Sequence, residues 1–280
     1  MFRILNLIVF ALSLISAFLG CGGGGSDSSQ TTGGSNNPKA VQVLFVGDSL
    51  TYVNDLPGTF RQLAETGGHS INAPMVGTGG ETLTEHSLSQ AELDKIRSQH
   101  WHYVVLQEQS QVPIFASLNY TDSDTGKKFA DEMYTAAHQL DAVIHGQGAQ
   151  TIFFVAWGRD ESRAQSMISQ HPMSSSQMQQ YINAAYKNVA DSLGGRTIAP
   201  VGSAWQTARI RGVPDNALWD VNDGYHPAIA GTYLAACVFY ATIFKESPIG
   251  LSYTGGLSQN DASILQAAAW DQYKAQSSGE

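Results

Sequence analysis

Five short runs rich in apolar residues alternate along the chain with longer amphipathic segments. The first run, 41–46, reads Val-Gln-Val-Leu-Phe-Val and ends at Gly47. Apolar residues on both faces are typical of buried strands in a parallel sheet. Strands that alternate with helices predict a doubly wound α/β fold. The expected strands are 41–46, 70–75, 103–106, 151–156 and 197–201, and the expected helices are 56–66, 91–98, 126–145, 175–193 and 228–245.

The folded part is expected to be one domain, 40–280. It has neither a second linker nor an internal repeat, and roughly 240 residues suit a single α/β domain. Its one cysteine, Cys237, lies in an apolar helical stretch and is expected to be a core residue without a disulfide partner. The net charge of −9 argues against a nucleic-acid partner, whose phosphates require a basic surface.

The first twenty residues have the features of an export signal. Arg3 provides a positive charge, and the apolar run 4–19 has the length of a signal-peptide core but is short for a membrane span. The run ends in Phe18-Leu-Gly-Cys21, which resembles the lipobox of bacterial lipoproteins, in which the cysteine is acylated and becomes the new N-terminus. Phe18 departs from the usual Leu, Val or Ile, and ordinary signal cleavage is the alternative. The resemblance predicts a lipoprotein signal peptide over 1–20 and lipidation at Cys21.

Residues 21–39 are predicted to form a flexible tether. They are rich in Gly, Ser, Asn and Thr, a composition that cannot bury apolar surface. The residue after Cys21 is Gly22 and not an aspartate. In a two-membrane bacterium, the lipoprotein resemblance therefore implies anchoring in the outer membrane. We expect the protein to be exported and to be anchored to the membrane through the lipid on Cys21.

Polar residues follow the expected strands, at the edge where α/β sheets bind ligands. Gly47-Asp48-Ser49 follows the first strand, and a serine at a strand-to-helix turn projects its hydroxyl while its own N–H faces a developing oxyanion. The alternative is a tight turn in which Asp48 and Ser49 cap the next helix. Asp223 and His226 lie in one later loop, and this spacing lets the carboxylate hold Nδ1–H while Nε2 faces a serine.

These segments resemble the conserved blocks of the SGNH/GDSL hydrolases. The segment beginning at Gly47 is similar to the first block, Gly-Asp-Ser-Leu, and Asp223 and His226 match the last block, Asp-x-x-His, including the proline that follows. The resemblance implies a three-layer, flavodoxin-like SGNH hydrolase fold with a five-stranded parallel sheet. It also implies Ser49 as nucleophile with Asp223 and His226 as its partners. Asp220 could compete with Asp223 and is interpreted as a loop or cap residue.

Two more turns are candidates for the oxyanion hole. Gly80 fits the glycine of the family's second block, with Gly79 as the alternative, because a glycine N–H can approach an anionic oxygen closely. The third block, Gly-x-Asn-Asp, is replaced here by Leu-Gln-Glu-Gln-Ser, and the chain looks like a member of a branch with this segment. Gln109 then stands where the asparagine is expected, with Gln107 in reserve, since glutamine offers the same amide donors. The expected donors are Ser49 N–H, Gly80 N–H and the Gln109 side chain.

Three further residues are expected near the substrate cleft. A Glu108 carboxylate beside an oxyanion would oppose its charge, so we expect Glu108 to pair with Arg159 at the crevice rim. Trp157 is expected to line the cleft or, equally, to be a buried strand-end residue. The remaining histidines lack ligand spacing, so neither a metal site nor a cofactor is expected.

The expected function is that of a serine esterase that works through an acyl-enzyme. Resemblance to extracellular carbohydrate esterases implies deacetylation of a carbohydrate, so the substrate would be a small-molecule or glycan ester. The alternatives are a lipase or lysophospholipase, an acyltransferase, and a non-catalytic glycan-binding lipoprotein. The sequence leaves the oligomeric state open.

Overall fold

The computed structural model describes residues 40–118, 123–168 and 171–278. They belong to one compact unit, Pro38–Glu280. The predicted signal peptide (1–20), the lipidation site Cys21 and the tether (21–39) lie outside the described residues and stay predictions.

All the named strands pair in parallel in one sheet, as expected from the alternation of strands and helices. The strands are β1 (Val41–Val46), β2 (Ile71–Asn72), β3 (Met75–Val76), β4 (Tyr103–Leu106), β5 (Gln150–Phe154) and β6 (Thr197–Ala199). Their order is β2-β1-β4-β5-β6, and β3 also pairs with β1. The prediction of a flavodoxin-like parallel sheet is confirmed.

The second expected strand, 70–75, forms two short pieces that share one position in the sheet. Ile71 pairs with Val41, and Met75 pairs with Phe45. Pro74 lies between the pieces and has no N–H to donate, although its carbonyl accepts from Phe45 N–H at 3.0 Å. The six named strands therefore fill the five expected positions.

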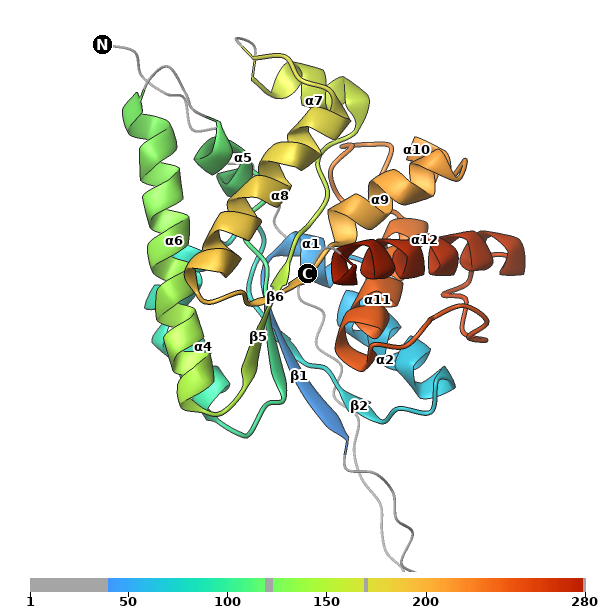
Figure 1. The fold of residues 1–280 in the computed structure, drawn as a ribbon, viewed down its shortest axis with the longest axis horizontal. Coiled ribbons are helices and arrows are strands. Elements are labelled where there is room, and N and C mark those ends of the chain that lie inside the picture. The colour runs from blue at the N-terminus through green and yellow to red at the C-terminus, as the bar shows by residue number, and fades with distance from the viewer. Residues whose placement is uncertain (1–39, 119–122, 169–170, 279–280) are drawn as a thin grey trace, which may run out of the picture. The chain divides into compact units, whose positions relative to one another are not determined.

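Helices cover both faces of the sheet and complete a three-layer arrangement (Figure 1). They are α1 (Ser49–Tyr52), α2 (Leu56–Thr66), α3 (Leu83–Leu88), α4 (Gln90–Arg97), α5 (Val112–Ser117), α6 (Ser123–Gly146), α7 (Glu161–Met167), α8 (Ser175–Ser192), α9 (Val201–Ile210), α10 (Asp215–Leu218), α11 (Ile229–Phe244) and α12 (Gln259–Ser277). β1 shows how the layers form, because Val43 and Phe45 join one core while Leu44 and Val46 join the other.

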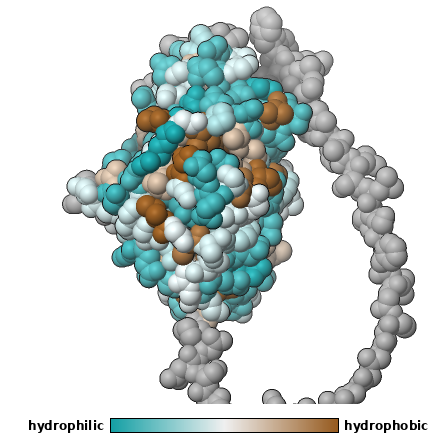
Figure 2. Space-filling model, turned by 90° about the vertical axis from the view of Figure 1, so that its right-hand side faces the viewer, coloured by the Kyte–Doolittle hydropathy of each residue, from teal (hydrophilic) through white to brown (hydrophobic). Residues whose placement is uncertain are grey.

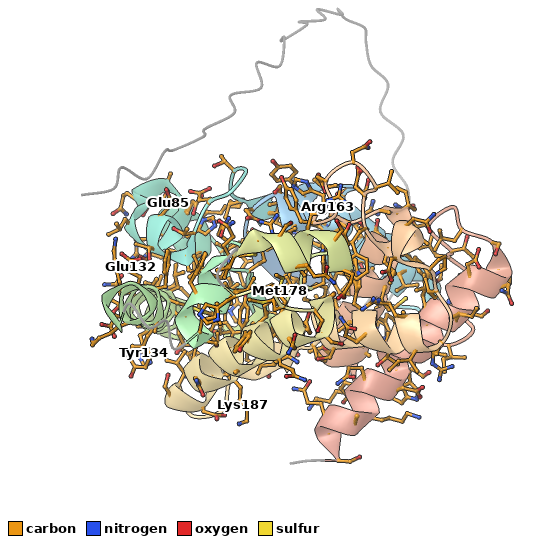
Figure 3. All side chains as sticks on the ribbon, turned by 90° about the horizontal axis from the view of Figure 1, so that it is seen from above. Glu85, Glu132, Tyr134, Arg163, Met178 and Lys187 are labelled. Carbon is orange, nitrogen blue, oxygen red and sulfur yellow. The ribbon has the colours of Figure 1, made fainter. Side chains whose placement is uncertain are left out.

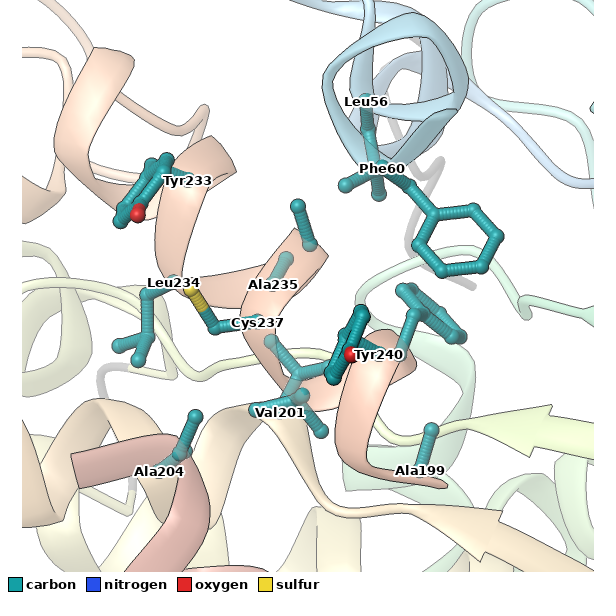
Figure 4. Close-up of a cluster of buried hydrophobic side chains, with 14 of the residues drawn as sticks. Leu56, Phe60, Ala199, Val201, Ala204, Tyr233, Leu234, Ala235, Cys237 and Tyr240 are labelled. Atoms are coloured by element: carbon teal, nitrogen blue, oxygen red, sulfur yellow. The ribbon is translucent and has the colours of Figure 1, made fainter. Parts of the chain in front are cut away.

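The core on the α11 side holds the helix that follows the His226 loop. Helix α11 is buried over almost its whole length, and Cys237 lies inside this core as a free thiol (Figure 4). Phe239 contacts Phe45 with ring centroids 5.1 Å apart in an edge-to-face arrangement. This packing fixes the start of α11 relative to β1, and therefore relative to Ser49.

Several helices were not predicted from the sequence, and the longest of them are α9 and α12. Val201 begins α9, although it was assigned to the fifth strand, which ends at Ala199. Helix α12 was missed because its buried face consists largely of alanines together with Leu265 and Gln266, which give little contrast between its faces.

Across the described segments, every helix is too short or too polar to cross a lipid bilayer. Figure 2 shows the side of the molecule that carries α2 and α12, where small hydrophobic groups toward the upper half are set among hydrophilic residues.

Candidate active site

Ser49 is the first residue of α1, at the carboxyl end of β1. Asp48 caps the helix, with Oδ1 accepting from Leu50 N–H at 2.9 Å. Gln107 supports the turn from below, because its Oε1 accepts from Asp48 N–H and from Thr51 Oγ1, each at 2.8 Å. The turn is therefore a capped helix start, which was the alternative interpretation. The same hydrogen bonds also hold the serine in a fixed position. Burial raises the pKa of Asp48, although the bond from Leu50 N–H acts in the opposite direction.

A chain of hydrogen bonds connects Ser49 with the two residues predicted to act with it. His226 Nε2 lies 2.8 Å from Ser49 Oγ, and His226 Nδ1 lies 2.7 Å from Asp223 Oδ2. The other Asp223 oxygen accepts the N–H groups of Tyr225 and His226, each at 3.0 Å. Partial burial acts to raise the pKa of Asp223, but these hydrogen bonds and the imidazole together hold it below its usual value. This order of groups can remove a proton from a serine hydroxyl and stabilise the imidazolium formed.

Contacts from distant elements hold the His226 loop in place. Asn54 Nδ2 donates to Pro227 O at 2.8 Å, and Asp160 N–H donates to Gly224 O at 2.8 Å. Arg163 on α7, labelled in Figure 3, donates to Asn222 O at 3.2 Å. The role of Asn54 was not predicted from the sequence. Its signal is the segment Asn54-Asp-Leu-Pro, a turn in which Asn54 takes the left-handed conformation, with φ of 58°.

Trp157 belongs to the core and does not line a cleft, so the alternative of a buried strand-end residue is correct. Its side chain is 3% exposed and stacks on Trp205 with ring centroids 3.9 Å apart. Its Nε1 donates to Tyr225 O at 2.8 Å, one residue before His226. The indole therefore acts on the site indirectly, by holding the loop.

The expected ion pair between Glu108 and Arg159 is wrong. Glu108 is 1% exposed, and its Oε1 accepts from Leu83 N–H at 3.0 Å and Gln109 N–H at 2.7 Å. Burial, against these two bonds, raises the pKa of Glu108 to about 8. A carboxyl group that is mostly protonated at pH 7 needs no cation, and its burial also removes it from the cleft rim. Arg159 instead lies over the ring of Tyr225.

The two glutamines that follow β4 have different environments. Gln107 is fully buried; besides its Oε1 contacts, its Nε2 donates to Glu108 O at 2.7 Å. Gln109 is half-buried, and its Oε1 accepts from Gln111 N–H at 2.7 Å. Among the described residues, no acceptor engages Gln109 Nε2 or the N–H of Ser49. These two groups remain available as donors to a ligand, whereas Gln107 serves the turn.

The three glycines that follow β3 differ in backbone conformation and in the space that a Cβ would have. Gly80 is exposed with φ of 75°, and within the described chain no acceptor engages its N–H. A Cβ on Gly79 would come within 2.9 Å of Tyr52 Oη, at the end of α1. Gly77, which sequence analysis did not single out, has φ of 128°, and a Cβ there would collide with Gly47 O at 1.7 Å. Gly77 thus allows this loop to approach the serine turn.

One histidine grouped with the scattered ones lies between two carboxylates. His86 is fully buried, with Nδ1 2.5 Å from Glu92 Oε2 and 3.8 Å from Glu81 Oε1. The three side chains could hold a metal ion, since their ligand atoms all lie within 4.8 Å of one another. The sequence pattern does not reveal this group, because Glu81 precedes α3 while His86 and Glu92 lie on two separate helices. The contact between His86 Nδ1 and Glu92 Oε2 also accounts for the nearest pair, so the group by itself assigns no metal.

The catalytic candidates lie in an open region. The side chains of His226 and Asp223 are 20% and 32% exposed. Five surface hollows of about 220 to 480 Å³ have neither Ser49 nor His226 in their linings, although one of them borders Asn54 and Ile229 beside the His226 loop.

Solved structures with the same fold include several esterases. A DUF4886 family protein from Bacteroides uniformis is 18% identical with a TM-score of 0.67, covering 83% of this chain and 94% of its own. A provisionally assigned SGNH hydrolase from Slackia heliotrinireducens is 23% identical with a TM-score of 0.55, covering 73% and 100%. A variant of an acetyl-xylooligosaccharide esterase from Geobacillus stearothermophilus is 16% identical with a TM-score of 0.51, covering 78% and 97%.

Similarity in sequence is much weaker than similarity in structure. No protein-family model matches the chain, and no curated protein is similar to it in sequence. The likeness therefore lies in the sheet order and the layers of helices. This chain has the three-layer α/β fold that the SGNH hydrolase and acetyl-xylooligosaccharide esterase structures share.

Proposed function

We propose that the protein is a serine esterase that removes acetyl groups from a carbohydrate. One observation carries the proposal: His226 contacts Ser49 Oγ at 2.8 Å through Nε2 and Asp223 at 2.7 Å through Nδ1. These are the nucleophile, base and orienting carboxylate that acyl transfer requires. The shared fold with ester-hydrolysing proteins supports the same chemistry.

In the proposed reaction, His226 accepts the Ser49 proton while Ser49 Oγ attacks the ester carbonyl carbon. The N–H groups of Ser49 and Gly80 and the amide of Gln109 stabilise the oxyanion, which suits their lack of acceptors in the described structure. The tetrahedral intermediate collapses, His226 protonates the leaving alcohol, and an acyl-enzyme remains. Water activated by His226 then releases the acid.

One comparison favours a short acyl group on a carbohydrate. Two of the structures with this fold are an acetyl-xylooligosaccharide esterase and an acetyl xylan esterase. The open site also suits an acyltransferase, because a sugar hydroxyl could replace water in the second step. A purely glycan-binding lipoprotein would have no use for the Ser49–His226 contact.

The test uses acetylated sugars alongside esters of longer acyl chains. We expect release of free acetate to exceed cleavage of octanoyl esters, together with covalent labelling by a fluorophosphonate. Ser49→Ala should abolish both turnover and labelling, whereas Ser263→Ala, a change at an exposed serine on α12, should leave both intact. Labelling that survives in Ser49→Ala would refute the nucleophile. Acetylated acceptor sugar in place of free acetate would establish the transferase.

The proposed location is the outer membrane of a two-membrane bacterium, reached through a lipid on Cys21. It rests on the sequence of the signal and tether. In cells, Cys21→Ala should move the protein from the membrane fraction to the soluble fraction. Unchanged membrane retention would remove Cys21 as the anchor.

A further inference from the structure

Arg159 places a positive charge close to the proposed triad. It follows β5, and its guanidinium carbon lies 4.9 Å from the ring centroid of Tyr225. The Tyr225 ring in turn lies 4.1 Å from the His226 ring. A single aromatic side chain thus separates the cation from the imidazole that contacts Ser49.

Asp160 and Asp223 are the two acids whose charges act on Arg159, and both already have other hydrogen-bond partners. Asp160 accepts the backbone N–H of Arg163 through Oδ1 and its guanidinium through Oδ2, each at 2.8 Å. Asp223 uses both of its oxygens on the His226 loop. Within the described part of the chain, no carboxylate lies within ion-pair distance of Arg159. No described acceptor takes a hydrogen bond from its side chain either.

The environment of Arg159 makes an unused cation costly. Burial lowers the pKa of Arg159, and Tyr225, Asp223 and Asp160 only partly offset this effect. Its Nε–H is fully enclosed and has no acceptor among the described residues. A half-buried charge without a partner loses hydration and gains no compensating contact. The two Nη groups, which are not enclosed and make no hydrogen bond to a described residue, are suited to a ligand that supplies both charge and acceptors.

We propose that Arg159 binds a carboxylate on the carbohydrate whose acetyl ester Ser49 cleaves, so that the preferred substrates are acetylated uronic acids. This inference rests on the proposed esterase function and names its substrate class. Carboxylate is the chemistry favoured, because a guanidinium is planar and matches the two oxygens of a carboxylate with two parallel N–H bonds. The protein carries a net charge of −9, so it repels anions in general and needs a local cation to bind one.

The first test is binding, which does not depend on turnover. The full chain carrying Ser49→Ala is titrated calorimetrically with the acetylated methyl glycoside of glucuronic acid and with that of glucose, which lacks the carboxylate. We expect the uronide to bind about 10- to 100-fold more tightly, the range of one charge-assisted contact. Adding Arg159→Met should reduce this ratio to below about threefold, and Arg159→Lys should restore part of it, because lysine keeps the charge and loses the fork.

Arg61→Met is the matched control. It removes one cation from an exposed pair with Glu65 on α2, so the uronide preference should remain. Equal affinity for the two sugars in the Ser49→Ala protein, or a preference that persists in Arg159→Met, would overturn the proposal without the need for any active enzyme. Free acetate tests the other source of a carboxylate, the product acid: acetate that binds as tightly as the uronide, and loses this affinity in Arg159→Met, would assign Arg159 to product and overturn the proposal.

A second measurement separates this inference from the esterase function. Wild-type protein that cleaves the neutral acetyl glucoside but shows no preference for the uronide supports the esterase and rejects the subsite. Protein that binds the uronide through Arg159 but cleaves neither sugar rejects the esterase and retains an anion-binding site.

Discussion

Asp223 and Glu108 are two carboxyl groups close to Ser49 that meet opposite environments. Asp223 lies in a loop, is 32% exposed, and accepts hydrogen bonds on both oxygens, one of them from an imidazole. Glu108 lies beneath the site, is 1% exposed, and accepts two backbone N–H groups on a single oxygen. The pKa of Asp223 is lowered, and that of Glu108 is raised to about 8.

This contrast shows that proximity to the site does not decide the charge of an acid. At Asp223, hydrogen bonds from two backbone N–H groups and from the imidazole outweigh partial loss of water and keep the carboxylate ionised, whereas at Glu108 nearly complete loss of water outweighs two backbone N–H donors. The first can stabilise an imidazolium, and the second can lie behind an oxyanion without repelling it. Substitutions of the two acids, and of two amides that act beside them, test how the groups around Ser49 divide their roles, and their effects on turnover are expected to decrease in the following order.

Asp223→Asn should give the largest loss. The amide keeps the shape but offers an N–H or a neutral oxygen to Nδ1, so the imidazole loses its orienting charge. We expect kcat to fall on the order of 10⁴-fold, as for a triad carboxylate. The measurement is acetyl release at saturating substrate. A fall of less than tenfold would mean that another acid, such as Asp220, performs this role.

Gln109→Ala should give the second-largest loss of kcat. Loss of one oxyanion donor costs about 10²- to 10³-fold in kcat, while KM and the melting temperature should change little. Gln107→Ala is the contrasting variant, because it removes the acceptor of Asp48 N–H and Thr51 Oγ1 and should lower the free energy of unfolding by about 1–3 kcal/mol. Full kcat in Gln109→Ala would remove it from the oxyanion hole.

Asn54→Ala should have a smaller effect. It deletes the donor to Pro227 O and places alanine at a φ of 58°, so both the loop and the backbone are perturbed. We expect roughly a tenfold loss in kcat/KM, the equivalent of one hydrogen bond. Asn54→Gly relieves the backbone without restoring the amide, and should therefore remain impaired. Full activity in the glycine variant would show that backbone conformation alone matters.

Glu108→Gln should change turnover least and stability most visibly with pH. The wild-type group has a pKa raised from 4.5 to about 8, so its contribution to stability is complete below pH 4.5 and is lost as pH rises toward 8. The glutamine variant cannot ionise. Its free energy of unfolding relative to wild type should therefore increase by up to about 1.4 kcal/mol per pH unit across this window. Denaturant titrations at several pH values measure it, and a constant difference would show that Glu108 is not held protonated.

Much of the fold could be predicted from the sequence. The strand 41–46, the helix 56–66 and the order of alternating elements followed from local patterns, because a strand buried on both faces must be apolar throughout. Helix α12 could not be predicted, because it depends on the packing of small residues. The break at Pro74 could not be predicted either, because it depends on pairing with β1.

The sequence by itself determined which residues could do chemistry: Ser49 after a strand, and Asp223 and His226 three residues apart in one loop. Only the tertiary structure decided which of their neighbours take part. Gln107, Trp157 and Asn54 became supports of the turn and the loop, Glu108 became a buried acid, and Arg159 was left without a protein partner. The physical reason is that a side chain's charge and available hydrogen bonds depend on burial and on contacts from distant elements, which a linear motif does not encode.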